Sequence, residues 1–262
     1  MNLGLAGQVI LVTGGSKGIG LACARAFAAE GAKVAIASRS REHLDTAVAT
    51  LKAEGHAVHA IAADLRDAAA AAAMVRDAEA ALGPLQVLVN SAGAAQRTPP
   101  DELRAEHWHA AMDAKYFTTV HAMQAALGGM AARGAGAIVN IVGTGGMVAT
   151  PTHLPGGAAN AALMLASAGL ARAFAPRGLR INVVNPGLVA TTRMTEGLQA
   201  QARMEGLSLE AVEARVRTGL PLGRIAVAED VANVVLFLAS GAAGYVSGAA
   251  VTVDGAVTAL PH

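Results

Sequence analysis

The sequence predicts a doubly wound α/β fold, in which a seven-stranded parallel sheet lies between two layers of helices. Seven short runs rich in valine and isoleucine alternate with longer alanine-rich stretches that have the composition of helices. The runs are apolar almost without interruption, as in strands covered on both faces, and the gaps between them are long enough for crossover helices. Because no repeat or linker divides the chain, residues 1–262 are expected to form a single domain.

The expected strands and helices alternate along the whole chain. The strands are expected at Gln8–Thr13, Lys33–Ser38, Ala57–Ala62, Val87–Asn90, Ala137–Val142, Arg180–Val184 and Ala250–Asp254. The helices are expected at about Gly18–Glu30, Arg41–Glu54, Asp67–Leu82, Arg104–Arg133, Asn160–Phe174 and Glu229–Leu238. In such sheets ligands bind beyond the carboxyl ends of the strands, so functional residues are expected directly after each strand.

Composition excludes several classes of function. The net charge is +1, the charges are dispersed and only 3% of residues are aromatic, which argues against a nucleic-acid partner. No run of about 18 apolar residues is free of charges and turn formers, so no membrane partner is expected. The first apolar run is followed by glycines rather than a cleavage signal, so no export peptide is expected. The single cysteine, Cys23, fits a cytoplasmic location. The histidines lack the spacing of metal ligands, so no metal site is expected.

A glycine-rich turn follows the first expected strand and opens directly into a helix. In the run Thr13-Gly14-Gly15-Ser16-Lys17-Gly18-Ile19-Gly20, the glycines at 14, 18 and 20 permit a tight turn and a close approach of the backbone to a pyrophosphate. The N-terminus of the helix offers free N–H groups to the phosphates. A plain strand-to-helix turn can also be rich in glycine, but the strand-turn-helix context favours a dinucleotide site.

The end of the second expected strand bears on the choice of dinucleotide. A carboxylate there binds the ribose 2′-hydroxyl of NAD, whereas a basic group accommodates the 2′-phosphate of NADP. The residues are Ala37, Ser38 and Arg39, with no acid among them, and Lys17 in the glycine turn supplies a second cation. The sequence therefore favours NADP over NAD, unless both cations are solvated surface charges.

These motifs, together with several later ones, resemble the short-chain dehydrogenase/reductase family over essentially the whole chain. The later motifs are Asp64-Leu65, Asn90-Ser91-Ala92-Gly93, Asn185-Pro186-Gly187 with Thr191, Tyr245-Val246-Ser247-Gly248, and Val253-Asp254-Gly255. The resemblance implies a Rossmann-type fold, a small-molecule substrate and a homo-oligomer, either tetramer or dimer. It also implies that Asp64 and Leu65 lie by the adenine, that Asn90, Ala92 and Gly93 line the adenine ribose, and that Pro186, Gly187 and Thr191 approach the nicotinamide.

The family's catalytic groups are where this sequence departs from the pattern. The family uses a serine, the pair Tyr-x-x-x-Lys and an asparagine on the long helix to hold the substrate oxygen and move its proton. Alignment on the flanking apolar runs places Gly143 at the serine, Gly156 at the tyrosine and Asn160 at the lysine. Lys115, seven residues after Trp108, stands at the asparagine. Asparagine and lysine thus exchange places, and Lys115 either binds the ribose hydroxyls or extends to the surface of an amphipathic helix.

The missing tyrosine leaves the proton donor to be found elsewhere. His153, three residues before Gly156, has a pKa suited to proton transfer at neutral pH, although a solvent-exposed loop histidine would look the same. Thr144 offers a hydroxyl to an oxygen, and the Asn160 amide can order a water molecule. The predicted catalytic set is therefore Lys115, Thr144, His153 and Asn160.

Three functions fit these residues. The first is an NADP-dependent oxidoreductase acting on a small carbonyl or alcohol compound with a non-standard catalytic site. The second is a dinucleotide-binding regulatory protein without catalysis, and the third is a non-redox enzyme using the same pocket. Residues 94–103 and 188–218 should cover the pocket, and because their charges are of both signs, a neutral or amphipathic substrate is expected.

Overall fold

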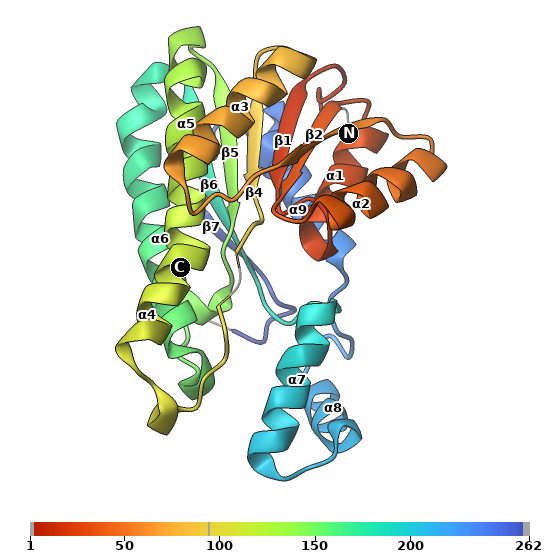
Figure 1. Cartoon of the computed structure of the whole chain (residues 1–262), viewed down its shortest axis with the longest axis vertical. Helices are drawn as coiled ribbons and strands as arrows, with labels where there is room; N and C mark the ends of the chain where they lie inside the picture. The colour runs from red at the N-terminus through yellow and green to blue at the C-terminus, as the bar shows by residue number, and fades with distance from the viewer. Residues whose placement is uncertain (1–2, 94, 259–262) are drawn as a thin grey trace.

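The computed structural model describes residues 3–93 and 95–258, apart from the side chains of residues 193, 196 and 200. Seven parallel strands form one sheet in the order β3-β2-β1-β4-β5-β6-β7. They span β1 Val9–Thr13, β2 Lys33–Ser38, β3 Val58–Ala62, β4 Val87–Asn90, β5 Gly136–Ile141, β6 Leu179–Pro186 and β7 Ala250–Val253. The expected doubly wound, Rossmann-type sheet is confirmed, and strand order reverses between β1 and β4 (Figure 1).

Helices cover both faces of the sheet (Figure 1). One layer contains α1 Gly18–Ala29, α2 Arg41–Ala53 and α9 Ala228–Ala239, and the other contains α3 Ala68–Leu82, α5 Thr118–Arg133 and α6 Leu154–Phe174. The short helix α4 Ala105–Ala111 precedes α5, while α7 Thr192–Glu205 and α8 Leu209–Thr218 project beyond the carboxyl ends of the strands. Each helical layer buries its own apolar cluster against one face of the sheet.

The structure corrects two helix predictions. The expected helix Arg104–Arg133 is divided into α4, a π-helical turn Met112–Phe117 and α5. The expected helix Asn160–Phe174 begins six residues earlier, at Leu154. Pro155 stands in its first turn, where proline is tolerated because the first N–H groups have no intrahelical partner, and the adjacent glycines hid this start in the sequence.

The helices α7 and α8 were not expected from the sequence. They form a small lobe whose own apolar cluster is built on Leu198, Ala202 and Val212. Few apolar positions among many charged ones give a weak helical pattern, which explains why this segment was expected only as a pocket cover.

The longest helix has the length and hydropathy of a membrane span. The segment Pro151–Arg177 meets both criteria, but core helices of water-soluble folds meet them as well. Here α6 packs along β6 and contacts α5 in the layer that covers the sheet.

Candidate functional site

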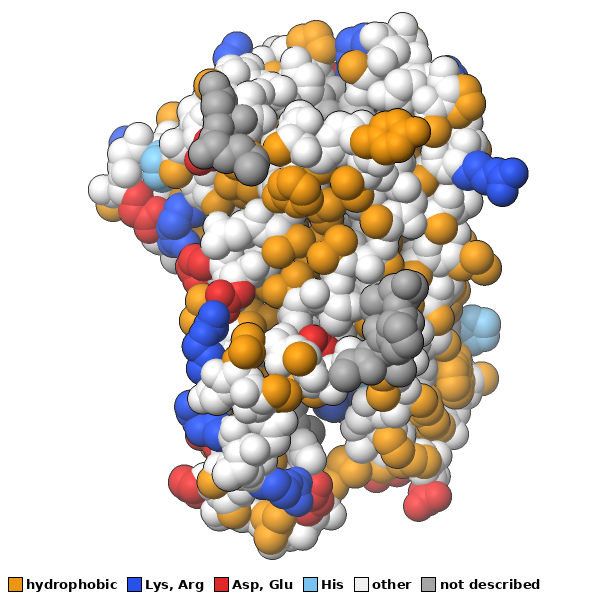
Figure 2. Space-filling view, turned by 180° about the vertical axis from the view of Figure 1, so that it is seen from behind, with side chains coloured by type: hydrophobic (Ala, Val, Ile, Leu, Met, Phe, Trp, Pro, Cys, Tyr) orange, Lys and Arg blue, Asp and Glu red, His pale blue; other side chains and the backbone are white. Residues whose placement is uncertain are grey.

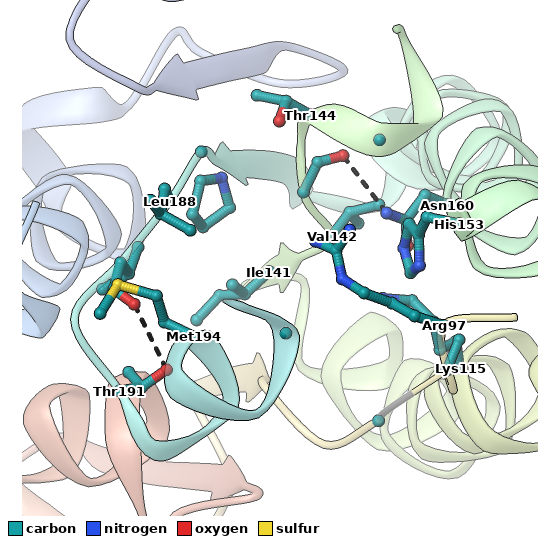
Figure 3. Close-up of a pocket in the computed structure, with 18 of the residues that line it drawn as sticks. Arg97, Lys115, Ile141, Val142, Thr144, His153, Asn160, Leu188, Thr191 and Met194 are labelled. Atoms are coloured by element: carbon teal, nitrogen blue, oxygen red, sulfur yellow. Dashed lines mark hydrogen bonds between the residues drawn. The ribbon is translucent and has the colours of Figure 1, made fainter. Parts of the chain in front are cut away.

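A cavity of about 590 Å³ lies at the carboxyl ends of the strands. Its walls come from the segment after β4, the segment after β5, the start of α6, the loop after β6 and helix α7 (Figure 3). Seen from behind, the molecule is hollowed between the lobe of α7 and α8 and the part opposite it (Figure 2). The volume is typical of a small-molecule site.

The glycine turn after β1 is shaped to bring backbone groups close together. Gly14 has φ +66°, and a Cβ there would lie 2.8 Å from the backbone N of Ala92. A Cβ on Gly20 would overlap the carbonyl oxygen of Gly14. Both positions therefore require glycine, and the first turn of α1 is left open beside them, which is the shape of a phosphate cradle.

The turn also faces the loop after β6. A Cβ on Gly18 would lie 3.4 Å from Cγ2 of Thr191, which places this threonine against the glycine turn. The Thr191 hydroxyl donates a hydrogen bond to the carbonyl of Val189 at 3.4 Å (Figure 3). Segments far apart in the sequence thus meet at one point.

Cationic side chains gather beside the ends of β1 and β2. Nζ of Lys17 lies 2.9 Å from Nε2 of His43, which is in the first turn of α2, and Arg39 is exposed just after β2. The sequence did not single out His43, because nothing in the chain indicates that residues 17 and 43 meet. The end of β2 therefore carries basic side chains.

The two residues expected at the adenine have different environments. Asp64 follows β3, and hydrogen bonds from Arg66 hold the pKa of its carboxyl at about 2. Leu65 is buried and packs in the apolar cluster under α3 and α5. Of this pair only the Asp64 side chain is partly open to solvent.

A chain of hydrogen bonds crosses the sheet from β1 to helix α6. The Thr13 hydroxyl donates to Oδ1 of Asn90, whose Nδ2 donates to Oδ1 of Asn140 at 2.9 Å. Nδ2 of Asn140 then donates to the hydroxyl of Ser167 on α6 at 2.8 Å, and this hydroxyl donates to the carbonyl of Leu163. Asn90 is thus engaged inside the protein, and β1, β4, β5 and α6 are tied together.

Around residue 156 the backbone leaves room for an imidazole. Gly156 lies on the first turns of α6, where a Cβ would lie 2.7 Å from both Nε2 of His153 and Cβ of Ala95 and would overlap Cε1 of the same ring. A Cβ on Gly145 would lie 3.0 Å from Cδ2 of His153. The ring therefore sits in the space between Gly145 and Gly156, at the wall of the cavity.

Asn160 is one helical turn further along α6 and is only 2% exposed. Its Nδ2 donates to the carbonyl of Gly143 at 3.4 Å, whereas its Oδ1 is buried with no hydrogen-bond partner in the described part of the chain (Figure 3). Gly143 has φ +119°, so a side chain there would be strained. A buried acceptor without a partner costs about 1–3 kcal/mol, which a donor from a ligand would recover.

Lys115 enters the cavity from the π-helical turn. Its backbone packs against Gly93, where a Cβ would lie 3.3 Å from Cα of Lys115. The side chain is half-buried and lines the cavity rather than extending away over the surface (Figure 3). Isolated π turns often occur at functional sites, because the extra residue turns one side chain away from the regular helical position.

Arg97 was not singled out from the sequence. Arg97 lies in the segment after β4, and its side chain extends into the cavity (Figure 3). Nη1 donates to the Thr152 hydroxyl at 3.3 Å, and Nε would lie 3.3 Å from a Cβ on Gly197 of α7. The protein around the guanidinium removes solvent and lowers the pKa of Arg97.

The structure sorts the sequence candidates into two groups along one edge of the sheet. All four predicted catalytic residues, Lys115, Thr144, His153 and Asn160, line the cavity, as do Ile19, Gly93, Pro186, Gly187 and Thr191. The remaining cofactor candidates lie outside the cavity lining, on or beside β1 to β4; they are Gly14, Ser16, Lys17, Gly18, Gly20, Arg39, Asp64, Leu65, Asn90 and Ala92.

The chain is similar to known proteins over almost its whole length. The family model described as enoyl-(acyl carrier protein) reductase matches residues 14–258. The chain is 37% identical over 256 residues to 2-(S)-hydroxypropyl-CoM dehydrogenase 3 of Xanthobacter autotrophicus, covering 98% of each protein. It is 38% identical over 237 residues to the inactive 2-(S)-hydroxypropyl-CoM dehydrogenase 2 of the same organism, covering 90% of this chain and all of that one. The crystal structure of L-sorbose reductase from Gluconobacter frateurii, complexed with NADPH and L-sorbose, superposes with a TM-score of 0.89 at 31% identity, covering 97% of this chain and 98% of that one.

Proposed function

Because the chain belongs to the short-chain dehydrogenase/reductase family of oxidoreductases, we propose that it is an NADP(H)-dependent enzyme with a proton-transfer site rebuilt around His153. Its substrate would be a small carbonyl or alcohol compound. The observation that supports this proposal is the His153 ring in the space next to Gly156, the residue that the sequence alignment assigns to the family's tyrosine. Residues 1–262 would act as one domain in the cytoplasm.

The glycine turn and the cations beside it fit NADP. A Cβ on Gly14 or Gly20 would fill the glycine turn, and the cations Lys17, Arg39 and His43, which lie beside the ends of β1 and β2, would hold the 2′-phosphate. No acidic residue occupies the end of β2, where a carboxylate would repel that phosphate. When bound, the cofactor would supply or accept the hydride. Thr191, Pro186 and Gly187 would hold its reactive end.

Four side chains would then act on the substrate and the nicotinamide ribose. Protonated His153 would give a proton from its imidazole to the oxygen of the reduced carbonyl, in place of the family's tyrosine. The Thr144 hydroxyl would donate a hydrogen bond to the substrate oxygen, and Oδ1 of Asn160 would accept one from a water molecule beside it. The Lys115 ammonium would bind the ribose hydroxyls. All four residues line one cavity, so one bound substrate together with the nicotinamide ribose could contact them.

The experiment is NADPH-dependent reduction of a panel of ketones, aldehydes and quinones by the parent protein and by His153→Ala. Removing a positioned acid should lower the rate by about 10²–10⁴ while NADPH still binds. His109→Ala, a change on the exposed face of α4, is the matched control and should keep full activity. Equal turnover by the parent and His153→Ala would show that His153 is not the proton donor.

A second function is supported by the same residues. Alignment on the flanking apolar runs assigns Gly143, Gly156 and Asn160 to the family's serine, tyrosine and lysine, and one relative at 38% identity is named inactive. A dinucleotide-binding protein without catalysis would retain the cradle but need no proton donor. NADPH binding by the parent without turnover of any compound in the panel would favour this function over the first.

We also propose that the chain forms a homo-oligomer, either a tetramer or a dimer. Leu165 on α6 is 78% exposed, and Phe117, at the start of α5, is 41% exposed. Apolar side chains of this size on neighbouring helices are typical of surfaces covered by another subunit. Sedimentation velocity of the parent and of Leu165→Glu tests this, since a monomeric parent would contradict it.

A further inference from the structure

The charged side chains that line the cavity are all cationic. They are Arg97 from the segment after β4, Lys115 from the π-helical turn and Arg203 from α7. No acidic side chain lines the cavity within the described residues. Charges of both signs along the covering segments had suggested a neutral or amphipathic substrate, but among the side chains that the structure describes only positive ones line the cavity.

Arg97 is the cation that is best placed to meet a substrate. Its side chain crosses from the segment after β4 toward Gly197 of α7, next to the wall that holds His153 and Gly156. Ala95, two residues before it, contacts the same wall. The guanidinium therefore lies between the proposed reaction centre and the lobe of α7 and α8.

Among the side chains that the structure describes, no acidic group neutralises the charge of Arg97. Its described hydrogen bond goes to the neutral Thr152 hydroxyl, and no carboxylate of the described residues forms an ion pair with it. Removal of solvent lowers the pKa of Arg97, which is the direction expected for a cation without a nearby anion. A guanidinium presents several N–H donors in one plane, which match two oxygens of an oxyacid group.

We propose that the substrate carries an anionic oxyacid group, a carboxylate, sulfonate or phosphate, and that Arg97 binds this group. This inference rests on the proposed function for the location of the substrate pocket, but it concerns binding and not turnover. Arg203 at the mouth of the cavity adds positive potential that draws the anion in. Lys115, whose backbone packs against Gly93, is assigned by the proposed function to the nicotinamide ribose, so Arg97 is the cation left for the substrate anion.

Binding measured by calorimetry on the complex with saturating NADPH tests the inference. The probes are 3-hydroxybutyrate, 2-hydroxyethanesulfonate and glycerol 3-phosphate, each beside a neutral partner: methyl 3-hydroxybutyrate, ethylene glycol and glycerol. Saturating NADPH keeps the anions away from the phosphate-binding turn. At least one anion should bind the parent ten times or more tightly than its neutral partner, and comparison of the three anions identifies the oxyacid.

The variant Arg97→Ala should weaken binding of that anion by about 10- to 100-fold and leave its neutral partner unchanged. If Arg97→Ala does not fold, Arg97→Gln replaces it as the test variant, because glutamine keeps most of the side-chain length without the charge. Arg76→Ala, on the exposed face of α3, removes one positive charge away from the cavity and should bind as the parent does.

Two results would overturn the inference: no preference for any anion over its neutral partner, or equal loss in Arg76→Ala and Arg97→Ala. Anion binding through Arg97 in a protein that reduces no carbonyl compound would support the inference while the proposed reductase activity fails. The two proposals are therefore tested separately.

Discussion

The packing of His153 over Gly156 leads to a prediction about helix α6. Alanine at position 156 gains up to about 1 kcal/mol of helix propensity over glycine. However, its Cβ would meet the His153 ring and would lie 2.7 Å from Cβ of Ala95. The ring can turn away, but Ala95 is fixed by its backbone, so one close contact remains.

The size of the effect follows from a comparison within the same helix. A Cβ on Gly169 meets no atom within 4 Å, so Gly169→Ala should stabilise the protein by about 1 kcal/mol. Overpacking typically costs about 1–3 kcal/mol, so Gly156→Ala should range from no change to about 2 kcal/mol of destabilisation. The two variants should therefore differ by about 1–3 kcal/mol in the free energy of unfolding.

Urea unfolding and thermal melting measure this difference. For a protein of this size, 1 kcal/mol corresponds to a Tm shift of about 2–4 °C. In addition, Gly156→Ala should lower turnover, because the His153 ring must leave its place, whereas Gly169→Ala should not. Equal stabilisation by the two alanines would refute the placement of the ring above residue 156.

Three further predictions concern the cofactor and the acid stability of the fold. NADPH should bind more tightly than NADH, and Arg39→Asp should shrink this difference; equal affinities in fluorescence titrations of the parent would refute the assignment. Lys115→Ala should weaken NADPH binding by about 1.5–3 kcal/mol, measured by the same titration. A cofactor-bound crystal structure with the Lys115 ammonium directed to solvent would contradict this contact. Hydrogen bonds from Arg224 hold the pKa of Asp230 at about 2, below the unfolded value of about 3.9, so this pair contributes stability above pH 4 that is lost as pH falls toward 2. The urea midpoints of the parent and Asp230→Asn should accordingly converge as pH falls from 5 to 2, and a constant gap would contradict this.

The sheet was predictable because its signal is local. The strands β2 and β4 begin and end where the sequence placed them, and the other strands differ by one or two residues at either end. Buried parallel strands are short aliphatic runs, and the order of the runs with helices between them leaves few topologies. The residues that follow those strands were predictable for the same reason.

The cavity was less predictable, because its geometry depends on contacts between distant segments. That Lys115 enters it depends on a π-helical turn, which needs one extra residue and has no pattern of its own. The sequence did not predict Arg97 and His43 as site residues, because the residues that they approach, Gly197 and Lys17, are far from them in the chain. Charge counted along a segment also does not tell which side chains the fold turns inward.

In the row of hydrogen bonds from Thr13 to Ser167, each side chain donates to the next one. This shared direction limits which residues can be substituted in the row. Asn140, in the middle, must accept on one side and donate on the other, so neither aspartate nor leucine can replace it without leaving a neighbour unsatisfied. The orientation of every amide in the row is therefore decided when the chain folds. Strand β1, which leads into the glycine turn, and helix α6 are then held in a fixed relation before any ligand arrives, so the cost of ordering them would not fall on binding.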